Sequence, residues 1–132
     1  MHKTLDTPYV YLELKDDPLI GTYLVGTYKK NPRLTFAMAK EIVKARLEFT
    51  GPEPVVALIF NEGVKSLDKK ARDYLASEEG IKGLKAVAYV LDNSFSSFLA
   101  NFFIAVGKAK LPIRVFSKKD AAMKWLVRFR NN

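Results

Sequence analysis

Hydrophobic and polar residues alternate near the start of the chain, in residues 9–14. Every second residue there is Val or Leu, which is the period of a strand buried on one face. The turn signal Asp-Asp-Pro follows at 16–18, and a second apolar stretch covers 19–28. The pattern predicts that the fold begins with an antiparallel β-hairpin.

From residue 35 onward the pattern switches between two periods. Four stretches repeat apolar residues at helical spacing: 35–49, 66–75, 93–107 and 120–129. Three short stretches between them have the composition of strands: 55–60, 86–91 and 113–116. This alternation predicts parallel strands joined by right-handed crossovers. We therefore expect an α/β fold in which a β-hairpin is followed by βα units, with a mixed sheet of about five strands and about four helices.

Side chains suited to helix N-caps stand before three of these helices. Ser66 precedes the second helix, and Asn93 with Ser94 precedes the third. Ser117 and Asp120 have the spacing of a capping box before the last helix. The sequence thus predicts where these helices begin.

The helix at 93–107 is distinctive because residues 95–107 carry no charge. Its predicted core stripe repeats apolar residues at helical spacing: Phe95, Phe98, Leu99, Phe102, Phe103 and Val106. The opposite face is also uncharged: Ser97, Ala100, Asn101 and Ile104. A helix without a charged face is usually covered on both sides, by a loop, a partner subunit or a ligand. We predict these four residues to form an interaction face, which would also serve a homodimer.

Arg46 lies within the apolar arc of the helix at 35–49. The simpler interpretation is an arginine whose stem covers apolar neighbours while its guanidinium stays in water. The alternative is a contact with an anion or carboxylate at an interface.

Composition and length favour one folded domain. The chain has 132 residues, of which 48% are hydrophobic and 27% charged, which suits a soluble globular protein rather than a disordered one. No linker or repeat divides the sequence, so residues 1–132 are expected to form a single domain with a core of about 8–128. The absence of cysteine, of an apolar leader and of a bilayer-length apolar run predicts a cytoplasmic protein without a membrane span.

The net charge of +8 is concentrated toward the C-terminus. Residues 1–85 contain 14 Lys/Arg and 12 Asp/Glu, whereas residues 86–132 contain 8 and 2. Such an excess of positive charge attracts anions in general and does not identify a specific partner. A solvated basic face is the simpler reading, because no nucleic-acid-binding motif accompanies these charges.

The C-terminal half resembles a known family. The resemblance rests on four features: the strand at 86–91, the segment Leu-Ala-Asn-Phe-Phe at 99–103, Leu-Pro-Ile-Arg-Val-Phe at 111–116 and Ala-Met-Lys-Trp-Leu at 122–126. Together with Ala-Arg-Asp-Tyr at 71–74, they are similar to uncharacterised members of the STAS-like, or SpoIIAA-like, domains of bacteria. The resemblance implies βα units packed on a mixed sheet, and a role in protein interaction rather than chemistry.

The resemblance also directs attention to one serine. In the anti-sigma-factor antagonists of this family, a phosphorylated serine in an Asp-Ser-Ser-Gly motif begins the helix after the first buried strand. Ser66 stands near that place, but its surroundings, Val-Lys-Ser-Leu-Asp-Lys at 64–69, lack the motif. Ser66 is therefore only a weak candidate phosphoacceptor, and a helix cap is the simpler role.

Candidates for catalysis are few. The only histidine is His2, near the terminus, and no glycine-rich phosphate loop occurs. The sequence therefore predicts a non-enzymatic protein without metal or cofactor. Ligands of parallel sheets usually lie at the carboxyl ends of strands, which suggests four residues as pocket lining: Asn61, Glu62, Asp92 and Asn93.

Three functions remain open. The first, which we favour, is a regulatory or protein-interaction module with an unknown protein partner. The second is a carrier of a small molecule or lipid, with an apolar cavity under Phe98, Phe102 and Phe103. The third is weak anion or nucleic-acid binding by the C-terminal basic residues.

Overall fold

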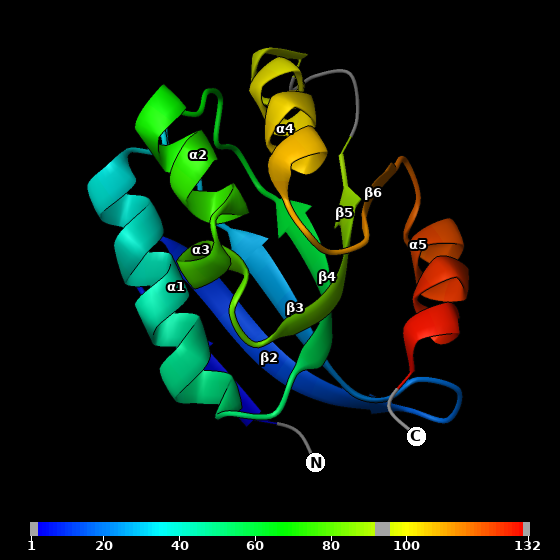
Figure 1. The fold of residues 1–132 in the computed structure, drawn as a ribbon. Coiled ribbons are helices and arrows are strands. Elements are labelled where there is room, and N and C mark those ends of the chain that lie inside the picture. Colours follow the sequence, from blue (N-terminus) through cyan, green and yellow to red (C-terminus); the bar gives the residue numbers. More distant parts are fainter. Residues whose placement is uncertain (1–2, 92–95, 131–132) are drawn as a thin grey trace.

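A six-stranded mixed sheet forms the centre of the computed structural model, which describes residues 3–91 and 96–130 (Figure 1). The strands lie side by side in chain order: β1 (Lys3–Asp6), β2 (Val10–Asp17), β3 (Gly21–Tyr28), β4 (Val55–Asn61), β5 (Leu84–Val90) and β6 (Ile113–Phe116). β1, β2 and β3 pair antiparallel, and β3 to β6 pair parallel. The predicted hairpin, mixed sheet and parallel βα units are confirmed.

The helices cover the two faces of the sheet unequally. They are α1 (Phe36–Thr50), α2 (Lys69–Ala76), α3 (Glu78–Ile81), α4 (Ser96–Lys108) and α5 (Lys119–Leu126), followed by the 3₁₀ turn η2 (Val127–Phe129). α1 to α4 lie on one face and α5 lies on the other (Figure 1). The three crossovers connect β3 to β4, β4 to β5 and β5 to β6, so each moves one strand along the sheet in the same direction. Right-handed crossovers that run in one direction place their helices on the same face of the sheet. Within the described residues, no helix is long and apolar enough to cross a membrane.

Two separate groups of buried side chains hold these layers together. Beneath α1, α2 and α4, one row of paired residues crosses four strands: Leu24, Ala57, Val87 and Ile113. Beneath α5, Ala122 and Leu126 pack on the alternate strand positions, including Val56, Leu58 and Ala88. Strand side chains alternate between faces, so β4, which lies inside the sheet, is apolar on both.

β1 was not predicted from the sequence. It pairs with β2, with Lys3 opposite Leu14. Its four residues, Lys-Thr-Leu-Asp, are too few and too polar to give a recognisable alternation. The Lys3 side chain donates a hydrogen bond of 3.0 Å to the carbonyl oxygen of Phe49, which attaches this edge strand to α1.

Two of the predicted helix caps are wrong. α2 begins three residues after Ser66, whose hydroxyl instead donates to the carbonyl oxygen of Pro32 at 3.0 Å. The chain stays extended there because Leu67 forms a parallel bridge with Leu34. Lys118 is the N-cap of α5, without a side-chain cap bond, so the box between Ser117 and Asp120 is not formed. The predicted caps Asn93 and Ser94 lie outside the described residues.

Candidate functional site

The first candidate site is an exposed apolar stripe on α4. Phe103 and Ile104 are 58% and 47% exposed, whereas large apolar side chains normally lose most of their exposure on folding. Ala100 and Gly107 are also exposed and occupy the same helix face, at spacings of three and four residues. We call these four residues the α4 stripe.

The α4 stripe only partly coincides with the interaction face predicted from the sequence. Ala100 and Ile104 belong to both. Asn101 is half-buried and its side-chain oxygen accepts a bond of 3.3 Å from Nη1 of Arg72 on α2. The side chain of Ser97 lies outside the part of the chain that the structure describes.

Phe103 was predicted as core, and this is wrong. Successive helical residues are roughly 100° apart, so Phe103 lies at the edge of the predicted stripe. The buried side chains of α4 are Phe98, Phe102 and Ala105. The core face of the helix is therefore centred near Phe98, at the edge of the predicted stripe that lies opposite Phe103. Docking against α2 rotates Phe103 outward and brings Ala105 inward.

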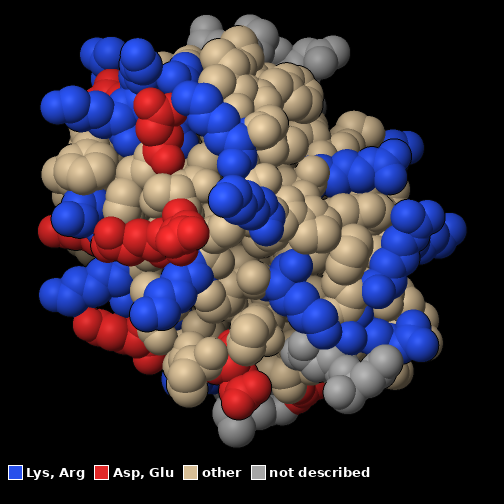
Figure 2. Space-filling view, viewed as in Figure 1, with Lys and Arg blue, Asp and Glu red and all other residues tan. Residues whose placement is uncertain are grey.

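Charged side chains border the α4 stripe on two sides. Lys108 ends the helix and Lys110 follows, both exposed. Asp73 on α2 accepts hydrogen bonds from Nε of Arg72 at 3.0 Å and Nζ of Lys108 at 3.2 Å. These two cations hold the pKa of Asp73 below its ordinary value. Figure 2 shows the uncharged area over α4, at the top of the view, with Lys and Arg side chains along its left and lower borders.

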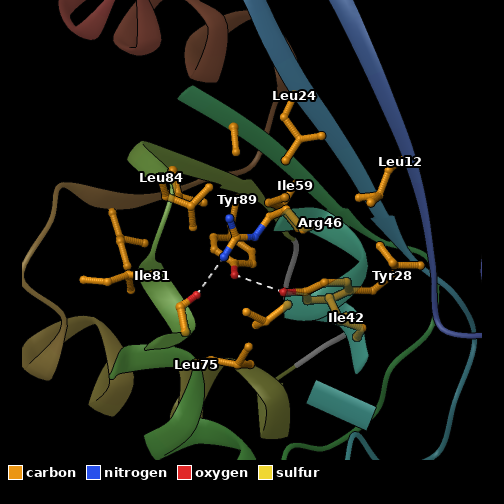
Figure 3. A pocket seen from close by; sticks show the side chains of 16 residues that line it. Leu12, Leu24, Tyr28, Ile42, Arg46, Ile59, Leu75, Ile81, Leu84 and Tyr89 are labelled. Atoms are coloured by element: carbon orange, nitrogen blue, oxygen red, sulfur yellow. Dashed lines mark hydrogen bonds between the residues drawn. The ribbon is translucent and has the colours of Figure 1, made fainter. Parts of the chain in front are cut away.

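The second candidate site is a cavity of about 60 Å³ between the sheet, α1 and the segment from α2 to β5 (Figure 3). Aliphatic side chains form most of its wall, including Leu12, Leu24, Ile42, Ile59 and Leu84. A smaller space of about 30 Å³ lies beside it, lined by Phe98 and Phe102 of α4. Tyr28 and Tyr89 contribute to both spaces.

Arg46 lines this cavity, and the interpretation of a guanidinium in water is wrong. The residue is only 6% exposed. Its Nη1 donates to the carbonyl oxygen of Lys82 at 2.7 Å, and its Nη2 donates to that of Gly80 at 3.0 Å. Burial lowers the pKa of Arg46, and Tyr28 and Tyr89 act in the opposite direction. The arginine thus connects α1 to the end of α3 from inside the fold.

The two tyrosines form a polar pair beside Arg46. Their hydroxyl oxygens are 3.2 Å apart, and their rings meet edge to face. Burial raises the pKa of the Tyr28 hydroxyl and raises that of Tyr89 well above its ordinary value. Figure 3 shows both hydroxyls and the guanidinium directed toward the same part of the cavity.

Of the four residues predicted to line a pocket at the strand ends, the structure describes Asn61 and Glu62. The Asn61 side chain is used by its own loop, since Oδ1 accepts from the backbone of Gly63 and Val64 and Nδ2 donates to Val64. Glu62 is exposed. Asp92 and Asn93 lie outside the described residues. Neither of the two described residues, Asn61 and Glu62, lines the cavity at Arg46.

The sequence did not show that Arg46, Tyr28 and Tyr89 lie together, although Arg46 and Tyr89 each gave a signal. Arg46 was the only charge in an apolar helical arc, and Tyr89 carries the only hydroxyl of the apolar strand 86–91. Tyr28 ends β3, on which it is buried. The neighbouring positions of β3, β4 and β5 in the sheet, an order that the sequence did not specify, bring these two tyrosines together on one face.

The class of the protein follows from this architecture. A solved structure described as an uncharacterized protein from the DUF3478 family with a SpoIIAA-like fold, from Shewanella loihica PV-4, superposes with a TM-score of 0.58. The match covers 94% of this chain and 98% of that chain at 18% sequence identity. The chain therefore has a SpoIIAA-like fold, as its sequence predicted.

A family assignment comes from the sequence match. Residues 22–130 match DUF7793, a domain of unknown function, and the chain belongs to this family. No protein in the search of curated proteins matches significantly. The residues of the two candidate sites therefore provide the basis for a functional proposal.

Proposed function

We propose that this chain is a non-enzymatic interaction module of STAS type that acts as one domain in the cytoplasm, and that the α4 stripe is its protein contact. The observation that carries the proposal is the adjacent exposure of Phe103 and Ile104, at 58% and 47%. Exposed apolar residues that occur singly need no explanation, but a contiguous pair on an uncharged helix face is typical of an interaction surface. Aromatic side chains also supply much of the binding energy at protein interfaces.

The charges around the stripe favour a particular partner. Lys108 and Lys110 follow the stripe, and residues 86–132 carry 8 basic and 2 acidic side chains. An apolar segment flanked by Asp or Glu would complement both the stripe and its border. An amphipathic helix is a suitable form, because it presents apolar residues at the same spacing as the stripe. A second copy of this chain would instead bring an equally positive surface to the site.

A peptide titration tests this proposal. The probe is an amphipathic helical peptide of about 18 residues, with Leu and Phe on one face and Glu at both ends, and the matched peptide carries Lys at both ends. We expect fluorescence anisotropy to show saturable binding of the Glu peptide and at least about tenfold weaker binding of the Lys peptide. Phe103→Ser should weaken binding of the Glu peptide by about tenfold or more.

Leu19 provides a matched control, because it is 66% exposed and lies between β2 and β3, away from α4. Leu19→Ser should bind the Glu peptide as the wild type does. Equal loss in both variants, or no binding by the wild type, would overturn the proposal. We expect sedimentation velocity to show a monomer. A dimer that Phe103→Ser dissociates would mean that the partner at the α4 stripe is a second copy of this chain and not an acidic segment.

A further inference from the structure

We propose that the cavity at Arg46 binds a small monocarboxylate anion, with its carboxylate on the guanidinium and on the Tyr28–Tyr89 pair and its short apolar tail among the aliphatic side chains. This site is separate from the α4 stripe. Arg46, Tyr28 and Tyr89 come from α1, β3 and β5, and all three line the same cavity. The inference rests on charge, hydrogen-bonding capacity and size.

The charge of Arg46 has no carboxylate partner. Among the described residues, no Asp or Glu forms an ion pair with Arg46. The oxygens of Gly80 and Lys82 that receive its hydrogen bonds are neutral carbonyls. A buried cation is costly unless an anion neutralises it, and carboxylates match the planar guanidinium well. A bound carboxylate would supply the missing negative charge.

Hydrogen-bond donors remain available at the same place. A guanidinium has five N–H groups, and two of its nitrogens make the bonds to Gly80 and Lys82. A hydrogen bond between two tyrosine hydroxyls uses one of their two hydrogens. The other hydroxyl hydrogen can be donated to an anion. The raised pKa values of both tyrosines keep these hydroxyls protonated at neutral pH.

The remaining wall defines the rest of the ligand. Leu12, Leu24, Ile42, Ile59 and Leu84 cannot solvate a second charge, so an apolar tail suits them better than a divalent anion does. A dry cavity of about 150 Å³ accommodates benzene. The cavity here is about 60 Å³, with about 30 Å³ beside it. These volumes suit an anion of the size of acetate or propionate and are too small for a lipid chain.

The test uses propionate as the probe and two-dimensional NMR of the full chain labelled with ¹⁵N. We expect sodium propionate to shift the backbone amides of Tyr28, Gly80, Lys82 and Tyr89 along one saturable curve, with a Kd of about 1 mM. Sodium chloride at equal concentration controls for ionic strength. Propanol, which has the same tail without the charge, should leave these resonances unchanged at that concentration.

Conservative variants separate binding from folding. Tyr28→Phe keeps the ring and removes one hydroxyl, and the double variant Tyr28→Phe/Tyr89→Phe removes both. Because a hydrogen bond to a charged group is strong, we expect the double variant to bind propionate about tenfold more weakly. Arg46→Met should abolish binding while circular dichroism reports whether it is folded. Tyr11→Phe is the matched control, since Tyr11 lies on β2 outside the cavity and should be neutral.

Three results would overturn the proposal. One is the absence of a saturable shift at these four amides in the wild-type chain. Another is equal binding of propanol, which would indicate an apolar cavity without anion recognition. The third is undiminished propionate binding by the folded double variant, which would place the anion elsewhere.

Discussion

At the scale of single residues, one cavity brings together a buried charge and two buried hydroxyls. Arg46, Tyr28 and Tyr89 lie in a cavity whose other walls are mainly aliphatic. Each polar group is partly satisfied, through two carbonyl oxygens or through the other hydroxyl. Such networks are stable when all members are paired and sensitive when one is removed or ionised. The tyrosines therefore couple stability to alkaline pH.

Tyr89→Phe should change the alkaline pH dependence of stability. Burial raises the pKa of Tyr89 well above 10.0, so the native chain keeps a proton that the unfolded chain releases near pH 10. The contribution of Tyr89 is thus fully present below pH 10 and is lost as pH rises through its folded pKa. The wild-type free energy of unfolding should fall more steeply above pH 10 than that of Tyr89→Phe, by up to about 1.4 kcal/mol per pH unit.

Urea denaturation of both proteins at several pH values between 8 and 11 measures this difference. Tyr89→Phe also loses the hydrogen bond to Tyr28, so its stability at pH 8 should be lower by about 1 kcal/mol. Parallel curves for the two proteins above pH 10 would contradict a strongly buried hydroxyl at this position.

At the scale of helices and strands, most of the longer elements could be predicted, whereas the short edge strand β1 and the start of α2 could not. The stretch 55–60 predicted a strand because it is apolar without alternation, as a strand buried on both faces should be, and β4 covers it. The start of α2 was misplaced because the bridge between Leu34 and Leu67 keeps the preceding chain extended. That bridge joins loops far apart in sequence, so no local signal at Ser66 could reveal it.

α5 depends on two buried residues for its place on the sheet. Ala122 and Leu126 are fully buried and are one helical turn apart, facing β4 and β5. Leu126→Ala should lower the free energy of unfolding by about 2–5 kcal/mol, because it leaves a cavity under the only helix on that face among the described residues.

Lys124→Ala is the matched control on the same helix, since Lys124 is exposed and should change stability by less than about 0.5 kcal/mol. Thermal or urea denaturation measures both variants. A Leu126→Ala protein as stable as the wild type would mean that α5 contributes little to the second core.

At the scale of the whole molecule, the sequence defined the fold class well and the candidate sites poorly. The order of helices and strands restricts parallel sheets to few topologies, which is why a mixed α/β sheet with βα units could be predicted. The SpoIIAA-like fold was implied by the family resemblance of the C-terminal half. Exposure of Phe103 depends on how α4 docks against α2, and the cavity depends on side chains from α1, β3 and β5. Neither relation is encoded in the periodicity of one element.

The distribution of charge also belongs to this scale. The chain carries +8, and its basic excess lies in the part that contains α4 and α5. Basic side chains around an apolar surface would accelerate association with an acidic partner and make it sensitive to salt. An interaction through the α4 stripe should therefore combine apolar contact with electrostatic attraction.

Amide hydrogen exchange of the whole chain, with and without the Glu-flanked peptide, tests the interaction surface most directly. We expect the peptide to slow exchange within residues 98–108 of α4, because binding stabilises the helix against local opening. Exchange in α5 and in the turn around Leu19 should stay unchanged. Protection that appears in α5 or in that turn, with α4 unaffected, would contradict the proposal that the α4 stripe is the docking surface.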